Sequence, residues 1–303
     1  MSVDLSVNIT GLTLKNPVMP ASGCFGFGRE YGEYYSLDRL GAVVVKATTL
    51  HPRLGNSTPR VTEVTGGMLN AIGLANPGLD QVLEEELPWL ANQNVPVIVN
   101  VAGDTVEDYC IVVDQICQSG LAHAIELNVS CPNVERGGLA FGVDPQVLRR
   151  LVEAVRPYCT LPLIVKLSPN VSRIQDVAMA AAEGGADALS LINTLVGMQI
   201  DLRTRRPVLA NRTGGLSGPA IKPVAVRMVY DVAKAVDLPL IGMGGIFTGK
   251  DALEFIMAGA SAVAVGTANF TDPRACPRII RELRELMAAE GIKNLEEIRG
   301  CAL

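Results

Sequence analysis

The stretch Ala124-Ile125-Glu126-Leu127-Asn128-Val129-Ser130-Cys131-Pro132-Asn133 joins a short apolar run directly to a polar loop. We predict a strand that ends at Asn128, followed by a loop whose path Pro132 restricts. Asparagine side chains offer donors and acceptors, and a thiol such as Cys131 can lose its proton near neutral pH when its surroundings favour the thiolate. The loop is therefore suited to bind a small polar ring and to take a proton from it. Ordinary turn formation is the alternative interpretation.

The rest of the chain alternates short strand-like runs with amphipathic helical patterns. Such alternation predicts parallel strands, and their nearly continuous apolar character predicts burial on both faces. Eight such units in 303 residues match a (β/α)8 TIM barrel that forms a single domain over residues 1–303, with a doubly wound sheet as the alternative. The alternation of Val3, Leu5, Val7 and Ile9 with polar residues predicts a strand of an N-terminal hairpin. The predicted barrel strands are 17–21, 42–46, 97–101, 124–128, 163–167, 187–192, 239–243 and 262–266.

Two connections are much longer than the others, residues 47–96 after the second predicted strand and residues 194–238 after the sixth. In a barrel the chemistry is built at the carboxyl ends of the strands, and long connections there commonly carry binding loops or lids. The predicted strands finish in polar residues, lysines or glycine pairs. We therefore expect both long connections to be active-site loops.

The composition limits the class of protein. The chain has 31 acidic and 26 basic residues and no basic run, so no nucleic-acid-binding surface is indicated. The longest uncharged stretch, 255–271, is interrupted by glycine and polar residues, so no membrane span is predicted, and the first residues lack a signal-peptide pattern. Seven irregularly spaced cysteines fit a reduced, cytoplasmic protein better than a disulfide framework.

The cysteine spacing also bears on metals. No two cysteines form a Cys-x2-Cys pair, so the sequence predicts no metal site and no iron–sulfur cluster within this chain. Cys110 and Cys117 lie seven residues apart on a predicted helix whose apolar face also holds Val106, Val113 and Ile116. This spacing favours packing in the core.

Two lysines each end an apolar run, Lys46 after Val43-Val44-Val45 and Lys166 after Leu163-Ile164-Val165. A lysine at the mouth of a barrel must reach water or pair with an anionic or electron-rich group. We therefore interpret both lysines as binding residues.

Glycines follow the seventh and eighth predicted strands, as Gly244-Gly245 and Gly266-Thr267. Backbone N–H groups there occupy the usual phosphate position of barrels, although glycine also serves turn geometry. Phe247 stands where a Gly-x-Gly-x-x-Gly motif beginning at Gly242 would need its third glycine. No Rossmann dinucleotide site is therefore predicted.

Together these motifs resemble the FMN-containing catalytic subunit of the class 1 dihydroorotate dehydrogenases, and the similarity extends from Asn16-Pro17 to the final helix. Cys131 stands where class 1 enzymes carry their catalytic base, whereas the membrane-bound class has serine. The end of the second strand and the run 67–74 are more similar to subclass 1B than to the fumarate-using subclass 1A. Besides residues 128–133, the matching segments are 46–49, 55–56, 59–60, 70–78, 214–218 and 244–245.

The resemblance implies an oxidoreductase of pyrimidine biosynthesis. Cys131 would remove the C5 proton of dihydroorotate while a hydride passes from C6 to FMN, which gives orotate. Lys166 would place positive charge where reduced flavin gathers negative charge. The implied substrate-binding residues are Lys46, Asn70, Gly73, Leu74, Asn128, Asn133, Asn193 and Thr194. The implied FMN-binding residues are Ser22, Lys46, Ala47, Asn100, Asn128, Lys166, Ile192, Gly218, Gly244, Gly245, Gly266 and Thr267.

The resemblance also implies a partner. Subclass 1B enzymes pass electrons to NAD through a separate subunit that carries FAD and a [2Fe-2S] cluster. We therefore expect an electron-transfer subunit and a heterotetramer of two catalytic and two electron-transfer chains, with no contact to nucleic acid or membrane.

Other classes stay open from the residues alone. A dihydrouridine synthase is also a flavin barrel with an active-site cysteine, but it acts on RNA, which the net charge disfavours. A Schiff-base aldolase using Lys166 would need no flavin. A noncatalytic flavin-carrying scaffold would not need polar groups at every strand end.

Overall fold

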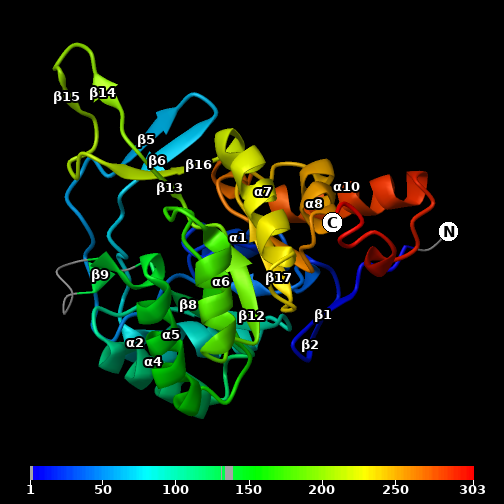
Figure 1. Cartoon of the computed structure of the whole chain (residues 1–303), viewed down its shortest axis with the longest axis horizontal. Coiled ribbons are helices and arrows are strands. Elements are labelled where there is room, and N and C mark those ends of the chain that lie inside the picture. Colours follow the sequence, from blue (N-terminus) through cyan, green and yellow to red (C-terminus); the bar gives the residue numbers. More distant parts are fainter. Residues whose placement is uncertain (1–2, 131, 134–138) are drawn as a thin grey trace.

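The computed structural model describes residues 3–130, 132–133 and 139–303. Eight parallel strands form one sheet that curls into a nearly closed barrel, with helices around it (Figure 1). The predicted barrel is thereby confirmed, and each predicted strand range contains one observed strand. In their order around the sheet, the strands are β3 (Val18–Pro20), β18 (Ala262–Val265), β17 (Leu240–Met243), β12 (Ala188–Leu191), β11 (Leu163–Lys166), β8 (Ala124–Asn128), β7 (Val97–Val101) and β4 (Val43–Val44).

The sheet is brought together at its two edge strands, β3 and β4, by a close backbone contact. Gly41, which lies shortly before β4, donates its backbone N–H to the carbonyl oxygen of Val18 at 2.9 Å. A Cβ atom on this glycine would collide with the carbonyl oxygen of Asn16. The absence of a side chain at this position therefore permits the approach that nearly closes the barrel.

Helices follow most barrel strands and cover the outside of the sheet (Figure 1). Thr105 and Thr248 begin two of them with capping boxes. In each, the threonine hydroxyl accepts a hydrogen bond from the backbone N–H of the aspartate three residues later, and the side chain of that aspartate accepts one from the backbone N–H of the threonine. Residues 79–91 form three successive helical segments, α2 (Leu79–Gln81), the π-helical turn η2 (Val82–Glu86) and α3 (Leu87–Ala91). The longer helices are α4 (Val106–Ser119), α5 (Pro145–Val155), α6 (Ile174–Glu183), α7 (Lys222–Ala233), α8 (Gly249–Met257) and α10 (Ala275–Ala289).

Shorter helical turns complete the connections. Among the helices that the structure describes, none is both long enough and apolar enough to cross a membrane. The short turns are α1 (Arg29–Gly32), α9 (Ala268–Thr271), η1 (Leu37–Arg39), η4 (Phe141–Val143), η5 (Arg156–Tyr158), η6 (Pro219–Ile221) and η7 (Leu295–Glu297).

The N-terminal residues form a hairpin of β1 (Val7–Ile9) and β2 (Leu12–Leu14), as the sequence predicts. The alternating pattern that starts at Val3 becomes a paired strand only from Val7 onward. Leu5, Val7, Ile9 and Leu14 are buried in the same cluster as the barrel strands. The hairpin therefore adds to the core rather than to the barrel sheet.

The two long connections come together as a second sheet. Its strand order is β13 (Leu195–Gly197), β16 (Gly214–Ser217), β6 (Gly67–Asn70) and β5 (Val61–Val64), and every pairing is antiparallel. A small hairpin of β14 (Ile200–Asp201) and β15 (Arg206–Pro207) projects beyond this sheet at the upper left of Figure 1. Residues 47–96 and 194–238, which are far apart in the sequence, are thus neighbours in space. A further short pair, β9 (Pro132–Asn133) and β10 (Leu139–Ala140), follows β8.

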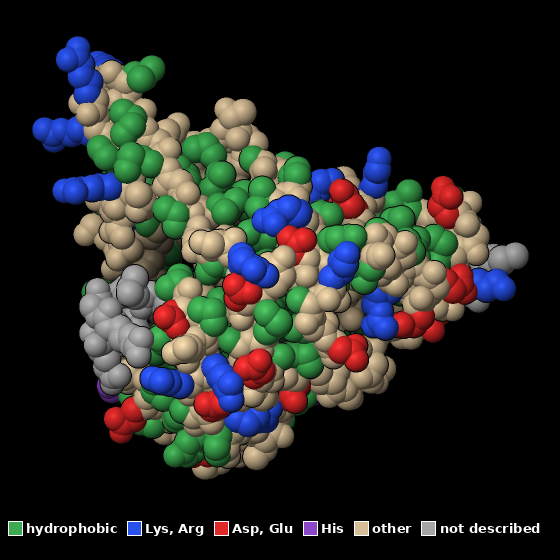
Figure 2. Space-filling view, viewed as in Figure 1, with side chains coloured by type: hydrophobic (Ala, Val, Ile, Leu, Met, Phe, Trp, Pro, Cys, Tyr) green, Lys and Arg blue, Asp and Glu red, His purple; other side chains and the backbone are tan. Residues whose placement is uncertain are grey.

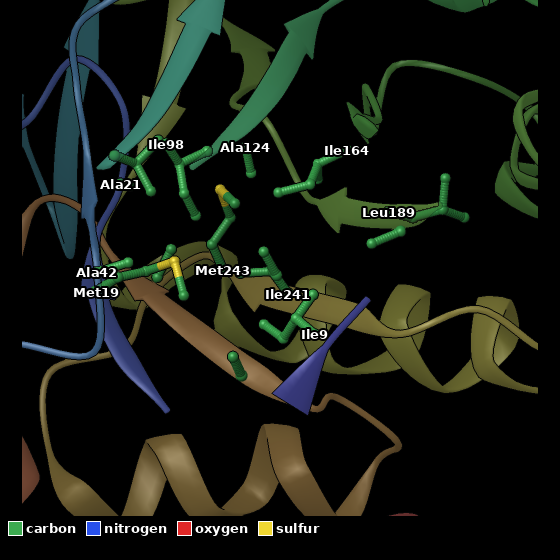
Figure 3. Packing of buried hydrophobic residues seen from close by; sticks show 14 of the residues in the cluster. Ile9, Met19, Ala21, Ala42, Ile98, Ala124, Ile164, Leu189, Ile241 and Met243 are labelled. Carbon is green, nitrogen blue, oxygen red and sulfur yellow. The ribbon is translucent and has the colours of Figure 1, made fainter. Parts of the chain in front are cut away.

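The interior of the barrel is apolar at one level and polar at the next. Figure 3 shows Met19, Ile98, Ala124 and Met243, from four different strands, gathered within the core. Successive positions on one face of a strand are two residues apart, so Asn100, Glu126 and Lys166 share the face of Ile98, Ala124 and Ile164 on β7, β8 and β11.

The predicted core packing of Cys110 and Cys117 is confirmed, since both thiols pack against the hydrophobic core.

Candidate active site

Three of the predicted site residues occupy the last or next-to-last position of adjacent barrel strands. Lys166 of β11 lies beside Asn128 of β8, and Asn100 lies on the neighbouring strand β7. All three side chains are almost completely buried, with exposed fractions of 5%, 9% and 0% for Lys166, Asn128 and Asn100. The parallel register therefore collects an ammonium and two amides at the carboxyl ends of three strands, where barrels carry their chemistry.

A buried carboxylate that the sequence analysis did not select lies among these residues. Glu126 accepts a hydrogen bond from Nδ2 of Asn100 at 2.6 Å and another from Oγ of Ser190 at 2.7 Å. Its Oε1 is also 3.8 Å from Nζ of Lys166. The signal was present in the sequence, because Glu126 is an acidic residue in the middle of an apolar strand, and buried charges are rarely left unpaired.

Asn100 keeps one polar atom free. Its Oδ1 is buried, and no group in the described part of the chain donates a hydrogen bond to it. Such an atom costs free energy unless a ligand or water donates to it. The site therefore presents a fixed acceptor that fits a bound group with its own N–H donor.

Lys46 follows β4, on the other side of Asn100. Burial lowers the pKa of its ammonium group, and the positive charge of Arg60 lowers it further. The Cys24 thiol is a further residue that the sequence analysis missed, because it sits in an unremarkable loop after β3. Burial raises the pKa of Cys24 to about 11 against the opposing effects of Lys166 and Lys46, so this thiol is neutral at physiological pH.

The first long connection places residues 70–76 against the strand ends. Leu74 packs on Ala47 and Ala102, which follow β4 and β7. The side chain of Asn76 fixes this segment, since its Nδ2 donates to Oγ1 of Thr49 at 2.8 Å and its Oδ1 accepts from the N–H of Gly78 at 2.9 Å. The predicted substrate residue Leu74 is thus held against Ala47, and the hydrogen bonds of Asn76 fix the segment that carries Gly73 and Leu74.

Asn70 lies on β6, at the centre of the second sheet. Its Nδ2 donates to the carbonyl oxygen of Gly215 on β16 at 3.4 Å. A Cβ atom on Gly215 would collide with Oγ1 of Thr194, so this glycine permits close contact between the two long connections. Asn70 and Thr194 are therefore brought to the same sheet by residues 214–217.

Asn193 connects the end of β12 to the loop after β8. Its Nδ2 donates to Oγ of Ser130 at 2.8 Å, and its Oδ1 accepts from the N–H of Thr194 at 2.8 Å. Ser130 directly precedes Cys131, which lies outside the described residues. Asn133 pairs with Leu139 through β9 and β10, and only its backbone is described. The predictions for the side chains of Cys131 and Asn133 therefore stay predictions.

The predicted phosphate residues lie after β17 and β18. A Cβ atom on Gly245, whose φ is 76°, would lie 2.8 Å from the carbonyl oxygen of Gly218, so these two glycines are in close contact. Oγ1 of Thr267 donates to Oγ of Ser217 at 2.8 Å. Within the described chain, no group accepts a hydrogen bond from the backbone N–H groups of Gly245, Gly266 or Thr267. These donors are therefore free for an anionic ligand.

Two other predicted residues have different surroundings. Ile192 is buried after β12, donates its backbone N–H to the carbonyl oxygen of Met243 at 3.0 Å, and lies against Gly244. Ser22 follows β3 and is partly exposed, and its side chain makes no hydrogen bond to another described residue. Ile192 is thus joined to the glycine loop, whereas Ser22 is near the strand ends only by its position after β3.

Comparison with known proteins identifies the family. A family model described as dihydroorotate dehydrogenase matches residues 4–287. A chain from Geobacillus kaustophilus (strain HTA426), named dihydroorotate dehydrogenase B (NAD(+)), catalytic subunit, is 60% identical over 98% of this chain and 95% of its own length. A chain of the same name from Bacillus pumilus (strain SAFR-032) is 59% identical over 98% and 96%. This chain therefore belongs to the dihydroorotate dehydrogenase family.

Proposed function

We propose that this chain oxidises dihydroorotate to orotate in the pyrimidine biosynthesis of the cytoplasm, with FMN as its bound cofactor. The observation that carries the proposal is the buried set of Asn100, Asn128 and Lys166 at adjacent strand ends of a chain that belongs to this family. Membership of this family argues against the two alternative enzymes, an RNA-modifying dihydrouridine synthase and a Schiff-base aldolase. The same strand ends would serve no purpose in a noncatalytic scaffold, because burying polar groups costs stability.

The residues present fit FMN. Its phosphate would be held by the free N–H groups of Gly245, Gly266 and Thr267, together with Gly244 and, nearby, Gly218 and Ser22. Asn100, Asn128, Lys46 and Lys166 would face the isoalloxazine ring, with Ala47 and Ile192 as apolar contacts. When bound, FMN would supply the hydride acceptor.

The substrate would be held at the other side of the same strand ends. Amides of Asn70, Asn128, Asn133 and Asn193 can both donate to and accept from the ring amides and the carboxylate of dihydroorotate. Lys46, Gly73, Leu74 and Thr194 would complete the pocket. Cys131 would take the proton from C5, and the bond between Asn193 and Ser130 would steady the loop that carries this thiol.

Turnover with an artificial acceptor tests the proposal. The purified chain, loaded with FMN, is mixed with dihydroorotate and a redox dye, and orotate and reduced dye are measured together. We expect equal amounts of both products. A yellow, folded protein that forms no orotate would disprove the proposed activity.

We further propose that NAD is reduced through a second polypeptide, an electron-transfer subunit with FAD and a [2Fe-2S] cluster, in a heterotetramer of two chains of each kind. The relatives are named as a catalytic subunit, which supports a partner. An exposed surface on the projecting β13–β15 segment supports it as well, since Val196, Met198, Ile200 and Leu202 are all about half exposed or more. Figure 2 shows hydrophobic and basic side chains gathered on this projection. Such a patch is common in protein interfaces.

The partner proposal has a direct test. The isolated chain should reduce dyes but not NAD, and NAD reduction should appear on co-expression with the electron-transfer subunit. Efficient NAD reduction by the pure chain would refute the need for a partner. Rapid fumarate reduction by the pure chain would instead place its acceptor specificity with subclass 1A.

A further inference from the structure

Glu126 has no role in the reaction described above, yet it lies inside the barrel with an exposed fraction of 1%. A carboxylate buried in such surroundings is strongly destabilising unless other groups compensate it. Apolar residues surround it in sequence, and an apolar side chain at this position would fit the strand pattern. Its presence therefore requires a reason beyond packing.

Three neighbouring strands provide the compensation. Asn100 from β7 and Ser190 from β12 each donate a hydrogen bond to a different oxygen of the carboxylate, and Lys166 from β11 provides the positive charge. Both oxygens are thus engaged, which fixes the orientation of the carboxylate. Ser190 in turn lies beside Lys166 in the parallel register of β11 and β12.

The first consequence concerns Asn100. Because its Nδ2 donates to Glu126, the amide cannot rotate without losing a short hydrogen bond to a charged group. Its Oδ1 is consequently the atom left free within the site. Because of Glu126, the amide of Asn100 presents an acceptor, and not a donor, to a ligand bound in the site.

The second consequence concerns Lys166. Its ammonium is nearly as buried as the carboxylate, and the two groups are 3.8 Å apart. In a poorly screened interior this separation is short enough for the negative charge to offset much of the field of the lysine. The net positive charge at the strand ends is therefore set by the pair and not by Lys166 alone.

We propose that Glu126 is a positioning residue for the flavin: it orients Asn100 and Lys166 and offsets the charge of Lys166, so that it holds the reduction potential of FMN below the value that the lysine alone would give. The inference rests on the proposed binding of FMN. It predicts that Glu126 and Lys166 act on the potential in opposite directions, which a purely structural role would not produce.

The test compares midpoint potentials of bound FMN, measured by equilibrium titration against a dye of known potential. Glu126→Gln should raise the potential, so that the ratio of reduced to oxidised flavin at a fixed solution potential increases on the order of tenfold. Glu126→Asp keeps the charge and should return the potential most of the way to the parent value. The matched control is Glu285→Gln, because Glu285 lies the same 3.8 Å from Arg281 but is exposed on α10.

The double variant Glu126→Gln/Lys166→Ala keeps the test valid if Glu126→Gln alone does not fold, since it removes both buried charges together. Its potential should lie close to that of the parent. A double variant whose potential falls as far as that of Lys166→Ala, or a folded Glu126→Gln protein with FMN bound and an unchanged potential, would overturn the inference. A parent chain that binds no FMN would overturn the proposed function together with this inference, whereas unchanged potentials with normal turnover would overturn this inference alone.

Discussion

On β7 and β8, two layers of the barrel interior lie one side-chain repeat apart and differ in character. Ile98 and Ala124 face each other in the apolar core, and two residues further along Asn100 and Glu126 face each other in a hydrogen-bonded pair. The layer of Ile98 and Ala124, here called the lower layer, contributes to stability through burial of apolar surface. The layer of Asn100 and Glu126, here called the upper layer, contributes less in this way because it holds polar groups at the strand ends. Changes in the upper layer should therefore affect activity, and changes in the lower layer should affect stability.

The largest effect is expected for the proposed catalytic base. Cys131→Ala should retain FMN and the stability of the parent but reduce flavin about 10²–10⁴-fold more slowly with dihydroorotate, which is the usual contribution of a general base. Cys131→Ser should be partly active only at higher pH, because a hydroxyl is a poorer base than a thiol. Stopped-flow absorbance measures both rates. The matched control is Cys301→Ala, since Cys301 is exposed near the C-terminus, and an unchanged rate in Cys131→Ala would remove this thiol from the mechanism.

The apolar layer should show the opposite separation. Ile98→Ala removes a side chain that is 1% exposed and should lower the free energy of unfolding by about 2–5 kcal/mol, because it leaves a cavity in the core. The midpoint potential of the bound flavin should stay unchanged. Denaturant unfolding and redox titration measure the two quantities. Met179→Ala, at a 39% exposed position on α6, is the control and should change neither. A shift of the potential in Ile98→Ala would show that the layers are coupled.

Much of this comparison could be predicted from the sequence. The eight strands, their parallel pairing and the polar strand ends all follow from local patterns, because an apolar run that ends in Lys46 or Lys166 needs only a few residues to be recognised. The second sheet could not be predicted, since β6 and β16 pair across more than a hundred residues and carry glycines rather than a strand-like pattern. Glu126 was visible in the sequence, but its meaning depends on hydrogen-bond donors from β7 and β12 and on the ammonium of Lys166 from β11, which only the register reveals.

The next largest effect is expected when the buried ammonium of Lys166 is removed. Lys166→Ala should lower the midpoint potential of FMN, because it removes positive charge near the reduced ring, and the ratio of reduced to oxidised flavin at a fixed potential should fall on the order of tenfold. FMN binding should weaken as well. Lys293→Ala, an exposed lysine far along the chain, serves as the control. If redox titration finds the potential unshifted while FMN is still bound, Lys166 has another role.

The smallest effect is expected for a charged pair outside the barrel. Nζ of Lys222 is 2.8 Å from Oδ1 of Asp251. Burial alone would raise the pKa of Asp251, but the bond to Lys222 and the N–H of Phe247 outweigh it and lower the pKa. The resulting stability is present above the ordinary pKa of 3.8 and is lost as the pH falls through the lower folded-state pKa.

Asp251→Asn should therefore cost about 1 kcal/mol at neutral pH, where it removes an ion pair and a capping box. The difference from the parent should shrink as the pH falls below about 4, since the parent then loses the same contribution. Denaturant unfolding at several pH values measures it. A difference that grows toward acid pH would show that Asp251 does not act through its charge.

The central claim is that the upper layer of this barrel holds a flavin that dihydroorotate reduces. The most direct measurement is the visible absorbance of the purified chain under anaerobic conditions, before and after addition of dihydroorotate. We expect a flavin spectrum that bleaches with formation of orotate in an amount equal to the flavin reduced. A chain that carries no flavin after incubation with FMN, or a flavin spectrum that dihydroorotate leaves unchanged, would contradict the account.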